Sequence, residues 1–442
     1  MFARIVALLL GLIGSIFGLV LIGFGLIGAI GGARTPEQFI GSASTFPLGV
    51  LLLELGLASA WFAWLRARGM TARSMTLPPW WACAAAFLIA VLLGWGALRL
   101  GWWWAFLPVA TVATFAPIVA TGRLGLPWGD GQPSWGRILP AFAWGALVTP
   151  VVAITLQLLG ALGAIGAAAL GYSLGDQRSL NTLLNIVRQL QGRTLTDGQT
   201  AALTQIVVKQ PIVLLLGAFI LVFIGPVTEE LGKFGAALLF SRTRADRPER
   251  DSTLTIFLIG LASGLGFAAT ENIFYAAQSG STGWTGLIFT RAVTPIMHGT
   301  ASALFALGWA HQRRNPQGWS LLRGAAMAIG LHGVWNLSAG MLIVSLLFTG
   351  SRGTAAGLAV LLTILVFATL AALAIGSVVT LLRLRRILAA ETAAEGIRIR
   401  FSVGRIPCLI VSCVFRRADP RNSLTARCRY LRTAIRLLTT GY

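Results

Sequence analysis

Apolar residues along the chain come in long, nearly unbroken runs, and not in the alternation of half-buried strands or the spacing of water-exposed helices. A helical run of about 20 apolar residues crosses a hydrocarbon core of about 30 Å. Lipid offers no hydrogen bonds, so a crossing segment has to satisfy its backbone groups internally, as a helix does. The runs therefore predict an all-α polytopic transmembrane helix bundle of about ten spans, near residues 5–30, 48–65, 79–98, 101–121, 138–165, 211–240, 255–279, 284–310, 320–348 and 354–382.

The short loops between these runs alternate between arginine-rich and arginine-poor. Such loops are retained on the cytoplasmic side of a membrane, so the alternation gives an orientation. The arginine-rich loops carry Arg66, Arg68 and Arg73; Arg123 and Arg137; Arg242, Arg244, Arg247 and Arg250; Arg313 and Arg314; and Arg383, Arg385 and Arg386. We predict a multi-pass protein of the bacterial inner (plasma) membrane with both termini in the cytoplasm. The first run is too long for a signal-peptide core and is expected to remain as the first span.

Composition agrees with a membrane protein and shows where the charge lies. The 442 residues are 56% hydrophobic and 11% charged, whereas soluble domains carry about 25% charged residues. The net charge is +21, and the segment 396–442 holds ten arginines against the single acid Asp419. These arginines suit contact with an anionic leaflet. Nucleic-acid binding would need the same charge but has no supporting fold, so we expect membrane lipids and no nucleic acid as partners.

Polar segments divide the runs into five predicted parts. The segment 176–210 is the one sizeable polar stretch between spans, and its apolar residues follow the spacing of an amphipathic helix. The predicted parts are an N-terminal membrane region of about five spans (1–175), a polar loop with an amphipathic helix (176–210), a membrane core of four spans (211–348), the last span with its basic end (349–395) and an arginine-rich cytoplasmic tail (396–442). We expect deletion after Ala394 to leave the spans assembled.

Ionisable side chains are costly inside a membrane, so those within the predicted spans are the best guide to function. They gather in four consecutive spans. The first block follows Gly225-Pro226, a step that can kink a helix. In the helix after it, Lys233 lies four residues from Glu229 and three from Glu230. Either carboxylate can therefore pair with the amine, and the other is left for chemistry.

The second block places an acid well inside an apolar helix. Asn272 follows Glu271 directly, and Tyr275 shares the face of Glu271 one turn later. The small residues before this block allow close packing of helices. A purely structural acid at this position would need a dedicated partner.

The third and fourth blocks contain two of the three histidines of the chain. Arg291 and His298 are seven residues apart, two helical turns, and so share a face; His332 and Asn336 are one turn apart. A single histidine on an apolar helix is more often a hydrogen-bonded packing residue than a catalyst. Two histidines in neighbouring spans, next to two acidic spans, instead predict one polar cavity shared by the four helices.

Two hydrolytic chemistries fit this set. In the first, Glu229 or Glu230 acts as a base toward a water that attacks a carbonyl, while histidine and asparagine stabilise the oxyanion. In the second, His298, His332 and Glu230 form a zinc site with an open position. We predict the first, without a cofactor, and keep zinc as the alternative. The predicted catalytic residues are Glu229, Glu230, Glu271, His298 and His332, supported by Lys233, Asn272, Tyr275, Arg291 and Asn336.

In this order and on successive spans, the four blocks resemble the PrsW family of intramembrane proteases, relatives of the CAAX prenyl-endopeptidase group. The family pattern is a Glu-Glu-x-x-Lys block, a Glu-Asn-x-x-Tyr block, a mid-span histidine after an arginine, and a His-x-x-x-Asn-like block. This chain has the first two at 229–233 and 271–275 and the others at Arg291 with His298 and at His332 with Asn336. The resemblance covers about residues 210–345. It implies a glutamate-dependent endopeptidase whose substrates are membrane-anchored proteins, with anti-sigma factors as the type of target.

The same buried residues suit one other class of protein, an ion- or proton-coupled transporter or channel. Alternating access usually rests on two repeated halves. The chain shows no strong internal repeat, and its buried polar residues are confined to one half. Proteolysis is therefore the prediction, and transport is the alternative.

Overall fold

The computed structural model describes residues 2–28, 30, 45–68, 77–125, 135–175, 211–241, 251–278, 280–348 and 354–403. The predicted amphipathic helix in 176–210 and the tail beyond residue 403 lie outside these residues. Every regular element within them is helical, as predicted. Residues 1–390 form one compact unit and residues 391–442 a second, and each is considered by itself.

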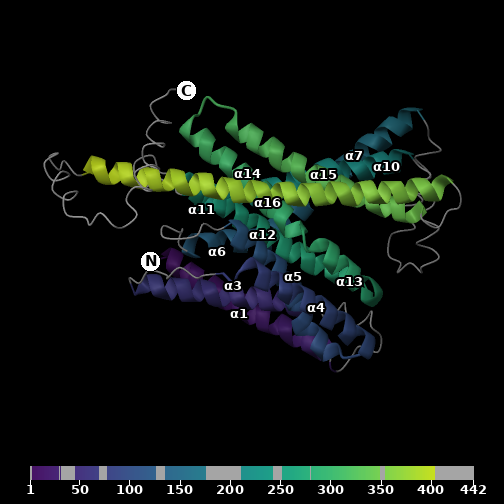
Figure 1. The fold of residues 1–442 in the computed structure, drawn as a ribbon, viewed down its shortest axis with the longest axis horizontal. Helices are drawn as coiled ribbons and strands as arrows, with labels where there is room; N and C mark the ends of the chain where they lie inside the picture. The colour runs from purple at the N-terminus through teal and green to yellow at the C-terminus, as the bar shows by residue number, and fades with distance from the viewer. Residues whose placement is uncertain are drawn as a thin grey trace, which may run out of the picture. The chain divides into compact units, whose positions relative to one another are not determined.

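Figure 1 shows the arrangement of the helices. In chain order they are α1 (Phe2–Ile27), α3 (Thr45–Ala67), α4 (Trp80–Leu100), α5 (Trp103–Gly125), α6 (Trp135–Ala143), the π-helix η2 (Trp144–Val148), α7 (Thr149–Gly175), α10 (Pro211–Phe219), the π-helix η3 (Ile220–Ile224), α11 (Gly225–Phe240), α12 (Thr253–Gln278), α13 (Gly280–Arg291), α14 (Thr294–Arg314), α15 (Ser320–Phe348) and α16 (Thr354–Val403).

Among the described residues, seven helical stretches are long and apolar enough to cross a membrane. They are Thr45–Phe62, Trp80–Leu100, Ala105–Gly125, Ile138–Ala164, Leu215–Phe240, Thr253–Ala276 and Gly357–Thr392. The protein is thus a multi-pass membrane protein. Helices α1, α14 and α15 occupy the remaining predicted positions; the apolar part found in α1 is the shorter stretch Gly11–Ile27.

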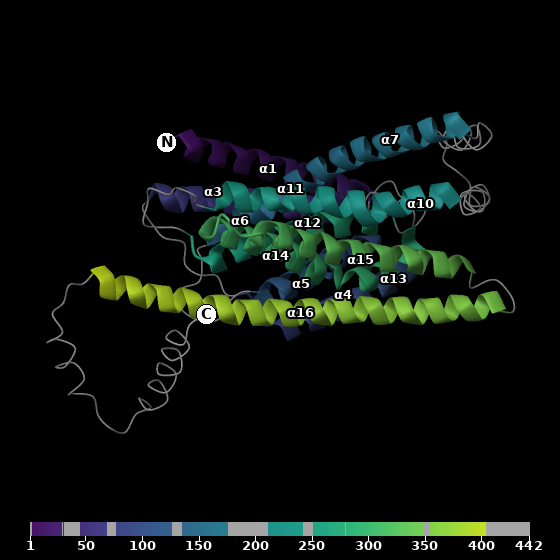
Figure 2. The same cartoon turned by 90° about the horizontal axis from the view of Figure 1, so that it is seen from above.

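Helix α12 is the centre of the bundle. Of its span Thr253–Ala276, 94% is buried, against 17–56% of the other candidate spans. It packs against α14, α6, η2, α11 and α5 (Figure 2). The approach is close because glycines of α12 face its neighbours. A Cβ on Gly264 would meet the backbone of His298, and one on Gly266 would meet the backbone of Phe142. Small residues thereby bring the α12 backbone next to the helices that carry the other polar blocks.

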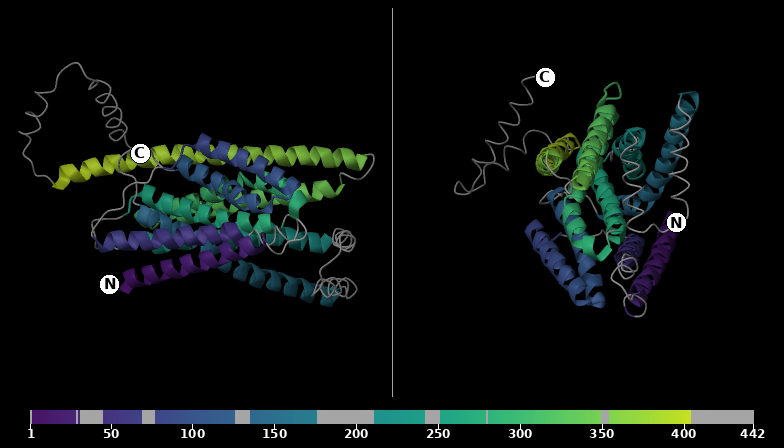
Figure 3. Two further views of the ribbon diagram at one scale, coloured as in Figure 1. Left: turned by 90° about the horizontal axis from the view of Figure 1, so that it is seen from below. Right: turned by 90° about the vertical axis from the view of Figure 1, so that its right-hand side faces the viewer.

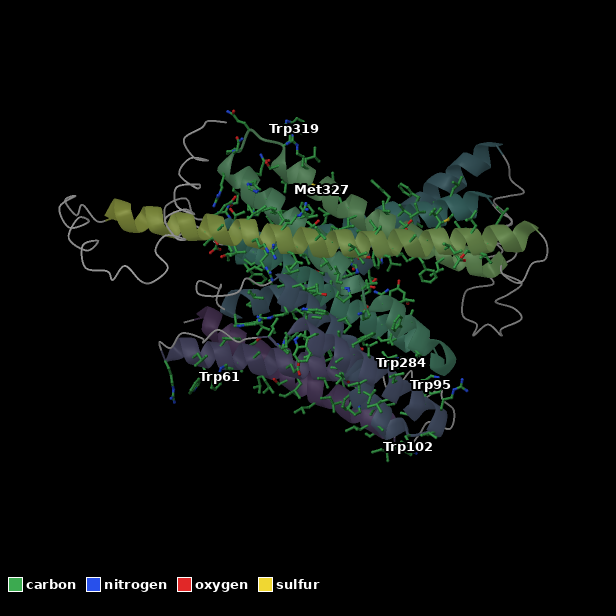
Figure 4. The ribbon with its side chains drawn as sticks, in the orientation of Figure 1. Trp61, Trp95, Trp102, Trp284, Trp319 and Met327 are labelled. Atoms are coloured by element: carbon green, nitrogen blue, oxygen red, sulfur yellow. The ribbon has the colours of Figure 1, made fainter. Side chains whose placement is uncertain are left out.

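The predicted span 284–310 is wrong as a single helix. Helix α13 ends at Arg291, and α14 begins at Thr294 after a turn. Pro295 lies in the first turn of α14, where its missing N–H costs nothing, whereas inside a continuous helix it would remove a hydrogen bond. Helix α13 is anchored separately. Its Trp284 is 1% exposed and packs edge-on against Phe106 of α5, with ring centroids 4.8 Å apart (Figure 4).

The kink predicted at Gly225-Pro226 takes the form of a π-helical turn, η3, directly before it. The N–H of Gly225 donates to the carbonyl of Ile220. Continued by one residue, this spacing would pair Leu221 O with the nitrogen of Pro226, which carries no hydrogen. Asn336 of α15 fills the gap, because its Nδ2 donates to Leu221 O at 3.1 Å. Turns of this kind are frequent at functional sites.

Helix α16 is longer than the predicted span 354–382 and continues past the predicted boundary at residue 395 to Val403. Arginine is a good helix former, so leaving the apolar run at Arg383 does not end the helix. Within the first unit, Leu381 and Leu388 are buried in the core cluster, and Arg385 Nη1 donates to Leu124 O of α5 at 2.9 Å.

Candidate active site

Four helices bring the predicted polar blocks together. Helix α11 carries Glu229, Glu230 and Lys233, and α12 carries Glu271. His298 lies in the first turns of α14 and His332 in the middle of α15. These helices pack on one another in the pairs α11–α12, α12–α14, α14–α15 and α11–α15. The side chains therefore meet in the interior of the bundle, as the sequence predicts.

Lys233 and Glu230 lie deepest, and the side chains of both are 0% exposed. The ammonium Nζ is 2.8 Å from Glu230 Oε1 and 3.5 Å from Glu229 Oε2. It also lies 4.2 Å from the centre of the Phe267 ring. The sequence left open which carboxylate pairs with the amine. The structure shows that Glu230 is the close partner and that Glu229 is more distant.

The protonation pattern of His298 follows from its neighbours. Its Nδ1 is 2.9 Å from Lys233 Nζ, and its Nε2 is 2.7 Å from Glu271 Oε2. An ammonium has no acceptor, so Nδ1 has to accept this bond. Nε2 then carries the hydrogen and donates it to Glu271. The two hydrogen-bond partners therefore fix which nitrogen of His298 carries the hydrogen.

His332 also donates to a carboxylate, but from Nδ1 and not from Nε2. Its Nδ1 lies 2.9 Å from Glu230 Oε1, and because an ionised carboxylate only accepts, Nδ1–H is the donor. The other nitrogen, Nε2, is 3.5 Å from Glu229 Oε2. Each histidine therefore has a carboxylate on one nitrogen, while the other nitrogen lies beside Lys233 Nζ in His298 and beside Glu229 in His332. Carboxylate–histidine pairs of this kind orient metal-binding imidazoles.

Glu229, His298 and His332 form a group that could hold a metal ion. One ligand atom from each residue lies within 4.8 Å of the others. Two histidines and one carboxylate are the ligand set of open, catalytic zinc sites. The donor types and the carboxylates behind them fit such an ion, and binding through His298 Nδ1 would replace the hydrogen bond from Lys233 Nζ. The zinc alternative drawn from the sequence placed Glu230 here, but Glu230 already accepts bonds from Lys233, His332 and Ser302 Oγ (3.1 Å).

Arg291, Asn272 and Tyr275 form the outer edge of the network. Arg291 Nη2 donates to Glu271 Oε2 at 2.5 Å, and its Nε donates to Asn272 Oδ1 at 2.8 Å. The guanidinium lies over the Tyr275 ring, 4.1 Å from its centre. The side chains of Glu271 and Arg291 are 20% and 14% exposed, whereas both histidines are 1% exposed. The site therefore opens on the Glu271 side.

Arg291 reaches the site by a different route from the one predicted. The turn after Arg291 places it on α13, so it shares no helical face with His298. The two side chains still meet, because both bond to Glu271 Oε2. The break between the helices is thus what lets an arginine from α13 reach an acid on α12.

Asn336 was predicted to help hold substrate and oxyanion, and its amide is directed elsewhere. Its Nδ2 donates to Leu221 O, the carbonyl that Pro226 leaves without a partner. One turn from His332 in sequence, Asn336 is thus engaged with the backbone of η3. In this structure Asn336 therefore supports the kinked backbone before Pro226, and its predicted role toward substrate stays a prediction.

Two side chains of the network were missed by reasoning from sequence. Gln157 of α7 donates Nε2–H to Glu229 Oε1 at 3.1 Å, and Ser302 of α14 donates to Glu230. Each carried a signal. Gln157 is a lone amide in a long apolar run, and Ser302 lies one turn after His298 on the same face.

Comparison with known protein families gives one match. The model of the family described as PrsW family intramembrane metalloprotease matches residues 133–373, which is more than half of the chain. The match extends the resemblance seen in sequence to α6 and α7 and so includes Gln157. No curated protein and no solved structure matches the chain.

Proposed function

We propose that this protein cleaves membrane-anchored proteins with a metal ion held by Glu229, His298 and His332. The premise is that the chain belongs to the PrsW family of intramembrane metalloproteases. The family makes the protein an intramembrane protease, a hydrolase. The metal ligands, the catalytic roles and the substrate are our inference from the site.

The observation that carries this proposal is the group of three inward-facing ligands. Glu229, His298 and His332 come from three helices, and their ligand atoms lie within 4.8 Å of one another. Two histidines and one carboxylate at this spacing are the ligand set of open, catalytic zinc sites. Together with the family description, this favours a metal over the metal-free glutamate mechanism that we predicted from sequence.

A zinc ion bound by this set would supply Lewis-acid polarisation of a peptide carbonyl and of water. Other residues of the network would orient the three ligand side chains. Glu271 fixes His298 through Nε2–H, and Glu230 fixes His332 through Nδ1–H. Gln157 steadies Glu229 by donating to Oε1.

We assign the general base to Glu271. Both oxygens of Glu229 and of Glu230 lie within reach of donors in the network. Glu271 is bonded through Oε2, and none of the described hydrogen bonds uses its Oε1. Because its side chain is also the most exposed of the three carboxylates, Oε1 is placed to take a proton from an attacking water.

The substrate class follows from the setting of the site. The network lies among membrane helices, so its substrates are proteins that enter or lie close to the bilayer. Anti-sigma factors are the target type that the family resemblance implies. The arginine-rich loops would place both chain termini in the bacterial cytoplasm.

The test is cleavage of a single-span anti-sigma factor by the purified protein in lipid nanodiscs. We expect cleavage that is lost with a chelator and regained when zinc is returned. Glu229→Gln and His332→Asn should lose it as well. His311→Asn is the matched control, because this third histidine is exposed at the end of α14. Cleavage that persists in the chelated, metal-free protein would contradict the proposal.

A further inference from the structure

A second site lies on the other side of α12 from the catalytic network. It is a cavity of about 540 Å³ between α3, α5, α6 and α12. Sites for small molecules have volumes of about 300–1,000 Å³. Its walls are almost entirely apolar, including Leu51, Leu55, Phe115, Leu139 and Leu261. We refer to it as the α3 cavity.

Glu54 is the one charged residue among those that line the α3 cavity. It lies in the middle of the span Thr45–Phe62, far from either end. No hydrogen bond or ion pair joins Glu54 to another residue of the described part of the chain. Thr111, which also lines the cavity, donates its hydroxyl to Leu107 O of its own helix at 2.9 Å. The walls thus offer Glu54 no cation.

An acid held at this depth is expensive, and such residues face a cavity and bind something there. The catalytic network shows how the same chain treats other acids within its helices. Glu230 and Glu271 are each joined to a lysine or an arginine as well as to a histidine. Within the described part of the chain Glu54 has no such partner, and it lines an apolar cavity.

We propose that the α3 cavity binds an apolar, single-chain molecule that ends in an amine, with the ammonium paired to Glu54. The wall residues select an apolar body, and the carboxylate selects a cationic end. A phosphate-bearing headgroup is disfavoured, since it would bring negative charge to an acid in a low-dielectric space. A fatty acid is disfavoured for the same reason. The occupant we infer is therefore an amine lipid of the membrane and not one of its anionic lipids.

The α3 cavity shares a wall with the active site. Leu258, Leu261 and Leu265 of α12 line it, while Ser263 and Glu271 of the same helix bond to Lys233 and His298. A Cβ on Gly299 would lie 2.9 Å from Leu261 Cδ1, so this wall packs directly behind the residue next to His298. An occupant would contact the helix that carries Glu271 without entering the catalytic network.

The experiment uses the full chain in nanodiscs of a neutral, amine-free lipid and two photoreactive probes, a diazirine dodecylamine and the matched diazirine dodecanoic acid. Crosslinked residues are located by mass spectrometry. We expect the amine to label the walls of the α3 cavity and the acid to label them far less. Glu54→Gln should weaken labelling by the amine about tenfold or more, as loss of a charge-assisted bond requires.

Three further variants make the result decisive. Val112→Trp adds bulk to the lining of the α3 cavity while leaving Glu54 unsubstituted, and should also remove labelling of its walls. Glu391→Gln removes an exposed acid outside the cavity lining and should change nothing. Glu229→Gln should leave labelling intact, which separates this proposal from the metal site. Equal labelling by amine and acid, or labelling that does not depend on Glu54, would overturn it.

Discussion

The hairpin of α1 and α3 and the core of α11 to α15 are both packed within a membrane bundle, yet different contacts hold them together. Helices α1 and α3 lie side by side (Figure 3) and meet through glycines. A Cβ on Gly49 would lie 2.7 Å from Gly18 O. The core also packs through glycines, but Lys233, Glu230 and the two histidines join its helices as well.

The difference shows which contacts carry function. Glycine packing needs only shape, because lipid gives no hydrophobic drive between helices and close backbones gain dispersion contacts. A buried ionic network costs desolvation and is weak evidence for stability. Among the described residues such a network is present in the core and not in the hairpin, which marks the core as the place where charge serves catalysis.

The largest effect should come from the proposed base. Glu271→Gln removes the proton acceptor but leaves the three metal ligands in place. We expect cleavage of a single-span substrate to fall about 10²–10⁴-fold, the usual contribution of a general base. Metal content, measured on the same sample, should stay at the wild-type level. Loss of metal together with activity would instead make Glu271 a structural support of His298.

The next effect is on stability. Lys233→Met leaves Glu230 and Glu229 without their shared cation. Removing one partner of a buried ion pair costs about 3–5 kcal/mol. Thermal unfolding in nanodiscs should shift strongly to lower temperature. An unchanged unfolding temperature would mean that Lys233 and Glu230 are more hydrated than their 0% exposure indicates.

A substitution in the hairpin gives the contrasting case. Gly49→Leu forces α1 and α3 apart, and overpacking of this kind costs about 1–3 kcal/mol. We expect lower thermal stability with full metal content, because no ligand lies in these helices. If this variant loses its metal, the two regions are coupled and the comparison between them fails.

The smallest effect is expected for Asn336→Leu. The bond from Asn336 to Leu221 O is worth about 1 kcal/mol. Cleavage should change little, with a small loss of stability. A fall of about 10²–10³-fold, the cost of removing an oxyanion donor, would restore the role that we predicted for Asn336 from sequence.

Hydropathy predicted the helical class and seven of the spans, because an apolar run such as Thr253–Ala276 is stable only in lipid or inside a helix bundle. It did not predict the break after Arg291. Apolar content continues through that point, and the turn depends on Pro295 and on where Trp284 packs. The part of α16 beyond Arg383 was missed because hydropathy marks where a helix leaves the membrane and not where it ends.

The four blocks predicted the residues of the network but not their individual partners. Glu229 and Glu230 are adjacent and look equivalent in sequence. They differ in the structure because α15 brings His332 Nδ1 to Glu230, while α7 brings Gln157 to Glu229. Both of those partners come from distant positions in the chain, so no local spacing could separate the two acids.

The metal content of matched carboxylate variants tests the central claim most directly. Purified wild-type protein, Glu229→Gln and Glu54→Gln would be exchanged with zinc and measured by elemental mass spectrometry. The account predicts one zinc per chain in the wild type and in Glu54→Gln, and a loss of zinc in Glu229→Gln. Zinc retained by Glu229→Gln, or absent from the wild type after exchange, would contradict a metal centre built on Glu229, His298 and His332.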